Sequence, residues 1–142
     1  MEIENLVIEK CIELFEQVRK VREEVPTTDS RVDYGVPPKA MLIQFGKGII
    51  EKADFRLTDI EKAWYYSDGI LSETDLTREW ITEPRSGMYH AEALAEFTVE
   101  EGTKRVWLNY CFGPLYARGV SFLVEQQDGS LKLCDEKLHW VS

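Results

Sequence analysis

Four side chains in the last third of the chain have the chemistry to bind an anion. They are a guanidinium, two phenols and an indole: Arg118, Tyr110, Tyr116 and Trp140. The strand register predicted for this region places Arg118 on an apolar face, beside Tyr110 and close to Trp140. A guanidinium there must be paired or must point into a wet cavity. Two interpretations stay open: an anion anchor with tyrosine walls, and a salt bridge to a helix carboxylate at the rim of the core.

Two histidines and two glutamates are the other candidates for chemistry. His90, Glu92 and Glu96 alternate along one predicted strand and point away from the apolar face. This pattern favours a solvated strand face over an acid–base dyad. His139 is predicted on the same outer face, and two histidines without close acidic ligands make a poor metal site. We therefore predict no catalytic residue, no metal and no cofactor.

The predicted outer face is only partly polar. Trp107 lies opposite Ser121 in the predicted register, and Leu94, Leu123 and Gly119 are its neighbours. Small residues beside a tryptophan let another surface approach closely. The face is either a protein interface, for a homodimer or a foreign partner, or a mixed face covered by a loop from residues 26–88.

Two turn signals set the register of the strands that carry these residues. Glu101-Gly102 and Asp128-Gly129 are pairs of the kind that closes a two-residue hairpin, because glycine accepts a positive φ. A three-residue loop is chosen between the second and third strands because it keeps the apolar residues on one face. The predicted pairs are Phe97–Val106, Ala95–Leu108, Leu108–Val120, Val106–Phe122, Tyr110–Arg118 and Val124–Leu133. A β-bulge near Asp135-Glu136 restores the side-chain alternation of the last strand.

The remaining elements are predicted to be helices. Residues 2–25 carry apolar side chains at helical spacing, and Pro26 ends the run. Pro37-Pro38 could open a second helix that extends to Ile50, and the capping box from Thr58 to Glu61 predicts a short helix through Tyr65. Residues 1–142 are thus expected to form one α+β domain, with helices packed on a bent four-stranded antiparallel C-terminal meander.

Composition limits the classes of partner. A chain of 142 residues fits one domain, and a formal net charge of −9 disfavours nucleic acid and anionic membranes. The charge favours a basic protein partner, or serves solubility alone. The N-terminus has no basic and apolar signal-peptide pattern, and no segment is long enough to span a membrane. Three widely spaced cysteines suit a reducing compartment, so a cytoplasmic location is expected.

The order of elements resembles the cystatin-like group, and within it the NTF2-like proteins. The string LNYCFGPLYARGVSFLV and the terminal HWVS resemble the ending of small bacterial NTF2-like proteins, some of which are immunity proteins against secreted toxins. The resemblance implies a bent sheet that wraps a long helix into a cone. NTF2-like isomerases use an Asp base and a Tyr donor inside the cone, whereas the inward positions here are Ala91, Ala93 and Ala95.

Two functions follow from these observations. The leading prediction is a non-enzymatic binding module, of the type of an immunity protein that neutralises a protein toxin. The alternative is a protein that binds a small anionic ligand, or an enzyme, with its site inside the cone around Arg118.

Overall fold

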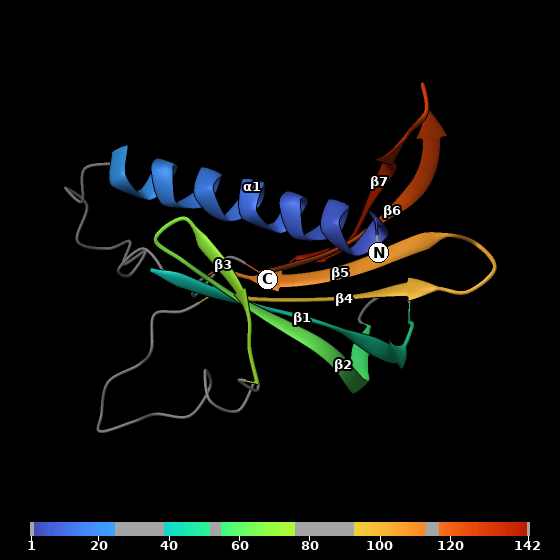
Figure 1. The fold of residues 1–142 in the computed structure, drawn as a ribbon, viewed down its shortest axis with the longest axis horizontal. Helices are drawn as coiled ribbons and strands as arrows, with labels where there is room; N and C mark the ends of the chain where they lie inside the picture. The colour runs from blue at the N-terminus through green and yellow to red at the C-terminus, as the bar shows by residue number, and fades with distance from the viewer. Residues whose placement is uncertain (1, 25–38, 52–54, 76–92, 113–116, 142) are drawn as a thin grey trace.

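The computed structural model describes residues 2–24, 39–51, 55–75, 93–112 and 117–141 (Figure 1). The described part of the chain has one α-helix, α1 (Glu2–Glu24), which matches the predicted N-terminal helix. Seven strands follow it: β1 (Ala40–Ile49), β2 (Arg56–Ser67), β3 (Ile70–Glu73), β4 (Ala93–Glu100), β5 (Arg105–Cys111), β6 (Ala117–Gln127) and β7 (Ser130–Val141). The fold is therefore α+β.

All seven strands form one mixed sheet in the order β3-β2-β1-β4-β5-β6-β7. β1 and β4 run parallel at its centre, and the other neighbours are antiparallel. β4 to β7 are consecutive neighbours, but the predicted four-stranded sheet is wrong because β1, β2 and β3 extend it beyond β4.

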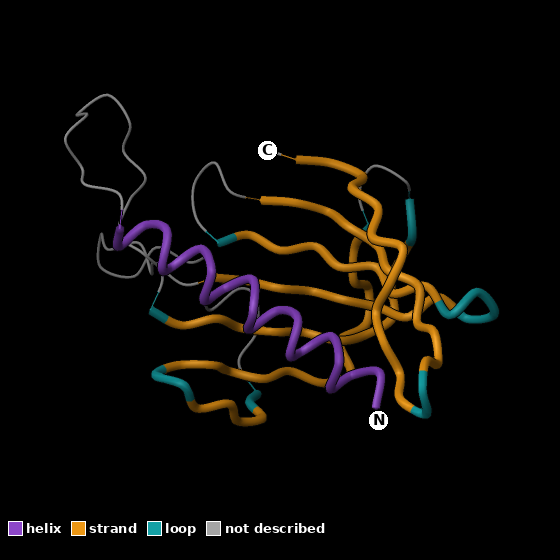
Figure 2. The backbone as a smooth tube through the Cα atoms, turned by 90° about the horizontal axis from the view of Figure 1, so that it is seen from above, coloured by secondary structure: helices purple, strands orange, loops and turns teal. Residues whose placement is uncertain are grey.

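Helix α1 lies across one face of the sheet (Figure 2). Its apolar stripe is buried there because residues at helical spacing share one side of a helix. Phe15 is fully buried, and its ring meets the edges of Tyr66 and Phe112 at 5.7 and 5.9 Å between ring centroids. This stripe forms one hydrophobic core together with the inward-facing residues of the sheet, among them Phe97, Leu108 and Val120. The space beneath the helix is therefore packed core.

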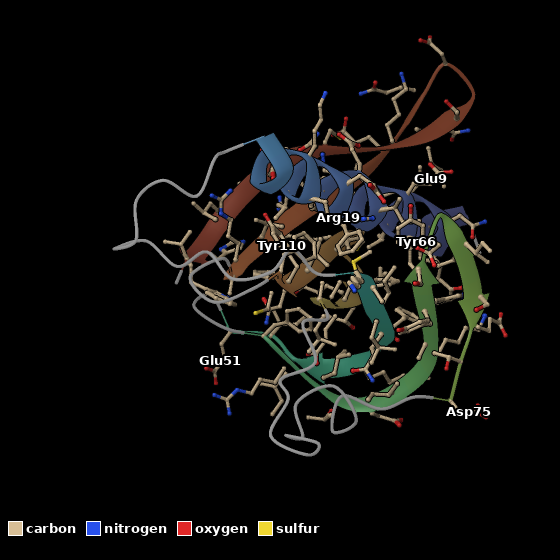
Figure 3. The ribbon with its side chains drawn as sticks, turned by 90° about the vertical axis from the view of Figure 1, so that its left-hand side faces the viewer. Glu9, Arg19, Glu51, Tyr66, Asp75 and Tyr110 are labelled. Atoms are coloured by element: carbon tan, nitrogen blue, oxygen red, sulfur yellow. The ribbon has the colours of Figure 1, made fainter. Side chains whose placement is uncertain are left out.

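The sheet bends around the helix. Figure 3 shows the strands as an arch beneath α1, with β5–β7 on one side and β2–β3 on the other. A register shift separates the pairs Ser121–Lys137 and Leu123–Cys134, and Asp135 has a φ of 53°. This is the predicted bulge near Asp135, and a bulge bends a strand. The β6–β7 hairpin accordingly rises beside the N-terminal end of α1 (Figure 1).

Both short helices predicted in the middle region are strands. The run Met41-Leu42-Ile43 is fully buried on both faces as the central strand β1, and a continuous apolar run is typical of such a strand. The capping-box residues Thr58 and Glu61 lie in β2. That strand ends in consecutive aromatic residues, which pack well in sheets. Tertiary context overrides the helix signals here.

The first predicted hairpin has the wrong loop length. Its turn spans four residues, 101–104, instead of the predicted two. Gly102 and Lys104 in this turn have positive φ. Phe97 consequently pairs with Leu108, and Ala95 with Tyr110. A shift of two residues preserves side-chain parity, so the same residues still face the core. The predicted pairs confirmed by the structure are Leu108–Val120, Val106–Phe122, Tyr110–Arg118 and Val124–Leu133.

The far half of the β1–β2 hairpin leaves the rest of the sheet. β1 pairs with β4 only as far as Phe45, and beyond it pairs with β2 alone, across two register shifts. Gly46 and Gly48 are required there: a Cβ on either would meet the carbonyl oxygen of Asp59 or Arg56 at about 2 Å. The hairpin then turns toward the face of the sheet opposite the helix, where Glu51 lies (Figure 3).

Candidate functional site

A groove lies on the face of the sheet opposite the helix, which we call the outer face. One side of the groove is the returning β1–β2 hairpin, held in place where the Asn109 side-chain amide donates a 2.6 Å hydrogen bond to the Phe55 carbonyl. The other side is the outer face itself. The volume of this open groove is about 500 Å³, and the lining residues are Phe55, Arg56, Leu94, Glu96, Asn109, Tyr110, Cys111 and Trp140. We call this cavity the outer-face groove.

A polar row crosses the sheet at the groove. Gln44 pairs with Glu96, Glu96 with Asn109, and Asn109 with Gly119, so their outward positions are adjacent on four neighbouring strands. Glu96 has only 6% of its surface exposed, and Gln44 is fully buried. The Gln44 side-chain amide has no hydrogen-bond partner in the described part of the chain. A buried side-chain amide without a hydrogen-bond partner is uncommon in folded proteins.

Trp140 forms the β7 side of the groove. It pairs with Gly119, and its indole lies so close to that residue that a Cβ there would be 2.0 Å from Nε1. The Nε1–H group is buried and has no acceptor among the described residues. A second register shift, next to Val120, brings Trp140 to this face. The groove is therefore lined by Glu96 and by the aromatic residues Phe55 and Trp140, whose indole N–H lies buried against Gly119.

A hydrogen-bond network lies beside the groove, around Ser121. Arg105 donates to the Ser121 hydroxyl oxygen at 2.7 Å, and that oxygen is 2.7 Å from His139 Nε2. Arginine can only donate, so the Ser121 oxygen accepts from Arg105, and the direction of its second hydrogen bond, with His139 Nε2, depends on the tautomer of the ring. Arg105 also bonds Asp135 at 2.9 Å, and the His139 ring stacks on Trp107 at 4.6 Å.

The distance between Ser121 and His139 is typical of a serine nucleophile and its general base, but a substrate cannot reach the Ser121 hydroxyl. Ser121 has 0% of its surface exposed, so no substrate reaches its hydroxyl. Burial, with the positive charges of Arg105 and Lys137, lowers the pKa of His139 below its ordinary value. The fully buried Cys11 thiol is inert for a similar reason, since burial raises its pKa to about 12. The network supports strands β5, β6 and β7.

Of the three described members of the predicted ligand-binding set, Tyr110 and Trp140 line the outer-face groove and Arg118 does not. Arg118 pairs with Tyr110 as predicted but is exposed, whereas Tyr110 is buried against Phe112 in the core. Trp140 was predicted on the helix side of the sheet and lies on the outer face, because the second register shift changes its side-chain parity. Tyr116 is outside the described residues. The ligand site around Arg118 stays a prediction.

The predicted interface residues are largely covered by the chain itself. Trp107 has 9% of its surface exposed and donates to Glu100 at 3.1 Å, and Gly119 is buried. Leu94 and Leu123 are half-buried. The outer face is thus partly the covered, mixed face that the sequence left as an alternative. The homodimer stays a prediction, and Trp107 offers little surface to it.

The polar candidates of the predicted first strand have a mixed outcome. Glu96 lies on the outer face as expected, but it is buried instead of solvated. His90 and Glu92 lie outside the described residues. No three His, Cys, Asp or Glu side chains come together as a metal site in the described ranges. The helix that the structure describes is not apolar enough to cross a membrane.

Sequence reasoning missed the residues that close the groove. Phe55 and Arg56 lie between the two segments that were predicted to be helices, and Gln44 lies inside an apolar run. One available signal was Asp68-Gly69, which follows Trp64-Tyr65-Tyr66 and is the same turn signal as Asp128-Gly129. It closes the β2–β3 hairpin, with a φ of 53° at Asp68.

Comparisons of the chain with protein-family models, curated proteins and solved structures give no match.

Proposed function

We propose that the chain is a non-enzymatic protein-binding module that binds a basic protein, in the manner of an immunity protein that neutralises a toxin. The observation that carries the proposal is the charge of the β2–β3 side of the sheet. Five exposed carboxylates gather on these two strands, their turn and the residues just after β3: Asp59, Glu61, Asp68, Glu73 and Asp75. We call this surface the acidic edge.

The acidic edge also has apolar and backbone groups that favour contact with a protein. Ile70 is 69% exposed, Ile60 46% and Leu71 40%. β3 ends the sheet, so one side of its backbone has no neighbouring strand among the described residues. Exposed apolar residues that lie next to an unpaired strand edge and are surrounded by charged residues are typical of a surface that binds a partner. Carboxylates of one sign would also steer a basic partner toward it.

The partner is best sought among proteins encoded beside the gene. The purified chain is immobilised, and each neighbouring product is tested for binding at low and high salt. We expect one basic neighbour to bind, and to bind more weakly as salt increases. Absence of a binding neighbour would contradict the proposal.

A matched pair of variants tests the location. Glu61→Lys, Glu73→Lys and Asp75→Lys reverse charges on the acidic edge, and Glu125→Lys, Asp128→Lys and Glu136→Lys do so around β7, where all three are exposed. Three reversals of +2 each take the formal net charge from −9 to −3 in both variants. We expect the first variant to lose affinity by about tenfold or more and the second by about twofold or less. Equal losses would show that only net charge matters.

A further inference from the structure

We propose that the partner binds the acidic edge by strand addition: an extended basic segment of the partner pairs with the open side of β3 and becomes a further strand of the sheet. This inference rests on the proposed function, because the surface is the same, and it names the kind of segment that the surface takes.

The turn between β2 and β3 determines which backbone groups of β3 bond to β2. Asp68-Gly69 is a two-residue turn, so the residues on either side of it, Ser67 and Ile70, form a hydrogen-bonded pair. Along an antiparallel ladder such pairs alternate with pairs that share no hydrogen bond. Thr74 follows this alternation, since its N–H bonds the Ala63 carbonyl at 3.0 Å. Every second residue from Ile70 onward therefore directs its N–H and C=O toward β2.

The residues between these, Leu71 and Glu73, direct their N–H and C=O groups to the other side of β3. No strand of the described part of the chain lies on that side. In Figure 3, β3 is the outermost strand on its side of the arch, and Asp75 lies just past its end. Leu71 and Glu73 therefore present donors and acceptors at the spacing that an added strand requires.

The order of side chains along β3 defines the complementary segment. Ile70 and Leu71 are apolar and exposed, and exposed carboxylates lie on both sides of this pair. Asp68 precedes the pair, and Glu73 and Asp75 follow it. Cross-strand neighbours stabilise a sheet when apolar side chains meet each other and opposite charges meet. The segment that fits is therefore a short apolar pair with lysine or arginine on each side.

Other pairings at the ends of the sheet are less favourable. A second copy of the chain would bring the carboxylates of two acidic edges together, and like charges directly across two strands are destabilising. β7, at the opposite end of the sheet, is a poor template because it carries Lys132 and Lys137 and is bent by two register shifts. β3 carries no lysine and pairs with β2 without a register shift. Charge and geometry thus favour a basic segment at β3.

The test is an NMR titration of the ¹⁵N-labelled full chain with the peptide acetyl-Lys-Thr-Lys-Val-Val-Lys-Thr-Lys-amide. We expect the amide signals of Leu71 and Glu73 to move to lower field and their protons to exchange more slowly with solvent, because these N–H groups gain acceptors. The amide signals of Ile70 and Ser72 should move less, since these groups already bond β2. Unchanged Leu71 and Glu73 signals at saturating peptide would overturn the proposal.

Methylated peptides separate strand addition from attraction between charges. A strand has two hydrogen-bonding edges and needs only one to pair with β3. A peptide with N-methyl groups on alternate residues keeps one edge intact and should bind within about threefold of the parent, whereas the same peptide N-methylated on every residue should bind about tenfold or more weakly. All these peptides carry the same charge, so equal binding of the fully methylated peptide would overturn strand addition.

A matched pair of variants makes the same comparison on the protein. Glu73→Gln and Glu73→Pro remove the same charge, but only the proline removes the outward N–H, and an edge strand tolerates proline at such a position. We expect Glu73→Pro to bind the peptide about fivefold or more weakly than Glu73→Gln. Equal affinities of the two folded variants would contradict strand addition. If Glu73→Pro does not fold, the methylated peptides decide the question on the wild-type chain.

The results also distinguish this inference from the proposed function. If a basic neighbour binds the chain but the fully methylated peptide binds as well as the parent, the acidic edge acts through charge alone and strand addition is overturned. If no neighbour binds but the peptides and the Glu73 variants behave as expected, strand addition is supported and the proposed function fails.

Discussion

Protonation of His139 would make both ring nitrogens donors and add a positive charge beside the Ser121 hydroxyl. The protonated ring would bring a second positive donor toward an oxygen that Arg105 already occupies. Lys137 on the same strand adds further positive charge, and Asp135 is the carboxylate that partly offsets it by pairing with Arg105. The neutral histidine is therefore part of the folded arrangement.

This predicts that acid weakens the fold through His139. Its pKa is lower in the folded than in the unfolded chain, so the unfolded chain binds the proton first as the pH falls. The stability that the neutral ring contributes is complete above the ordinary histidine pKa of about 6.5 and is lost as the pH falls toward the folded value. Chemical unfolding measured from pH 8 to pH 5 checks this.

His139→Gln keeps a side-chain acceptor and removes the titration, so its unfolding free energy should depend less on pH in this range. His90→Gln, which replaces the other histidine, is the control and should retain the His139 contribution. Identical pH profiles for the wild type and His139→Gln would contradict the role assigned to the ring.

At the residue scale, the sequence predicted the face of the sheet correctly for some side chains and wrongly for others. It placed His139 and Trp107 on the outer face, and their 4.6 Å ring contact agrees. It placed Trp140 on the wrong face, because one extra residue in β7 reverses side-chain parity and nothing in the sequence beside Leu138 marks the shift. The burial of Glu96 could not be predicted, because the hairpin over it was read as helix.

At the scale of elements, turn chemistry was a better guide than helix capping. Asp128-Gly129 set the β6–β7 register correctly, because a two-residue turn leaves one way to pair the strands. The capping box at Thr58 predicted a helix that does not form. A local signal of this strength, worth about 1 kcal/mol, yields to the burial of Trp64 and Tyr66 in the core.

Packing between β6 and β7 depends on the missing side chain at Gly119. We predict that Gly119→Ala destabilises the fold by about 2 kcal/mol, because the new Cβ would overlap the Trp140 indole and force the ring away. Urea unfolding measures the loss. In a Trp140→Leu background the same substitution should cost clearly less, since the overlapping ring is gone. An equal cost in both backgrounds would mean that the loss comes from the β6 backbone.

At the scale of the whole molecule, the order of strands sets which parts open first. The parallel pair β1–β4 lies at the centre, flanked on each side by antiparallel strands and covered by α1. β3 is a four-residue strand at one end, with every residue exposed. β7 at the other end is bent by two register shifts. The stability of the sheet should therefore fall from the centre toward both ends.

Amide hydrogen exchange measured by NMR tests this gradient. The slowest amides should be those of residues 41–45 and 94–97, which lie in strands paired on both sides and carry fully buried side chains such as Met41 and Phe97. Amides of β3 should exchange fastest among the strands, because a local opening of this short end strand exposes them to solvent. Amides of β6 that bond β5 should be better protected than amides of β7, since an edge strand can separate while the core stays closed. Uniform protection across all seven strands would mean that the sheet opens only as a unit. In that case the acidic edge would be as rigid as the core, and a partner would meet a preformed surface there.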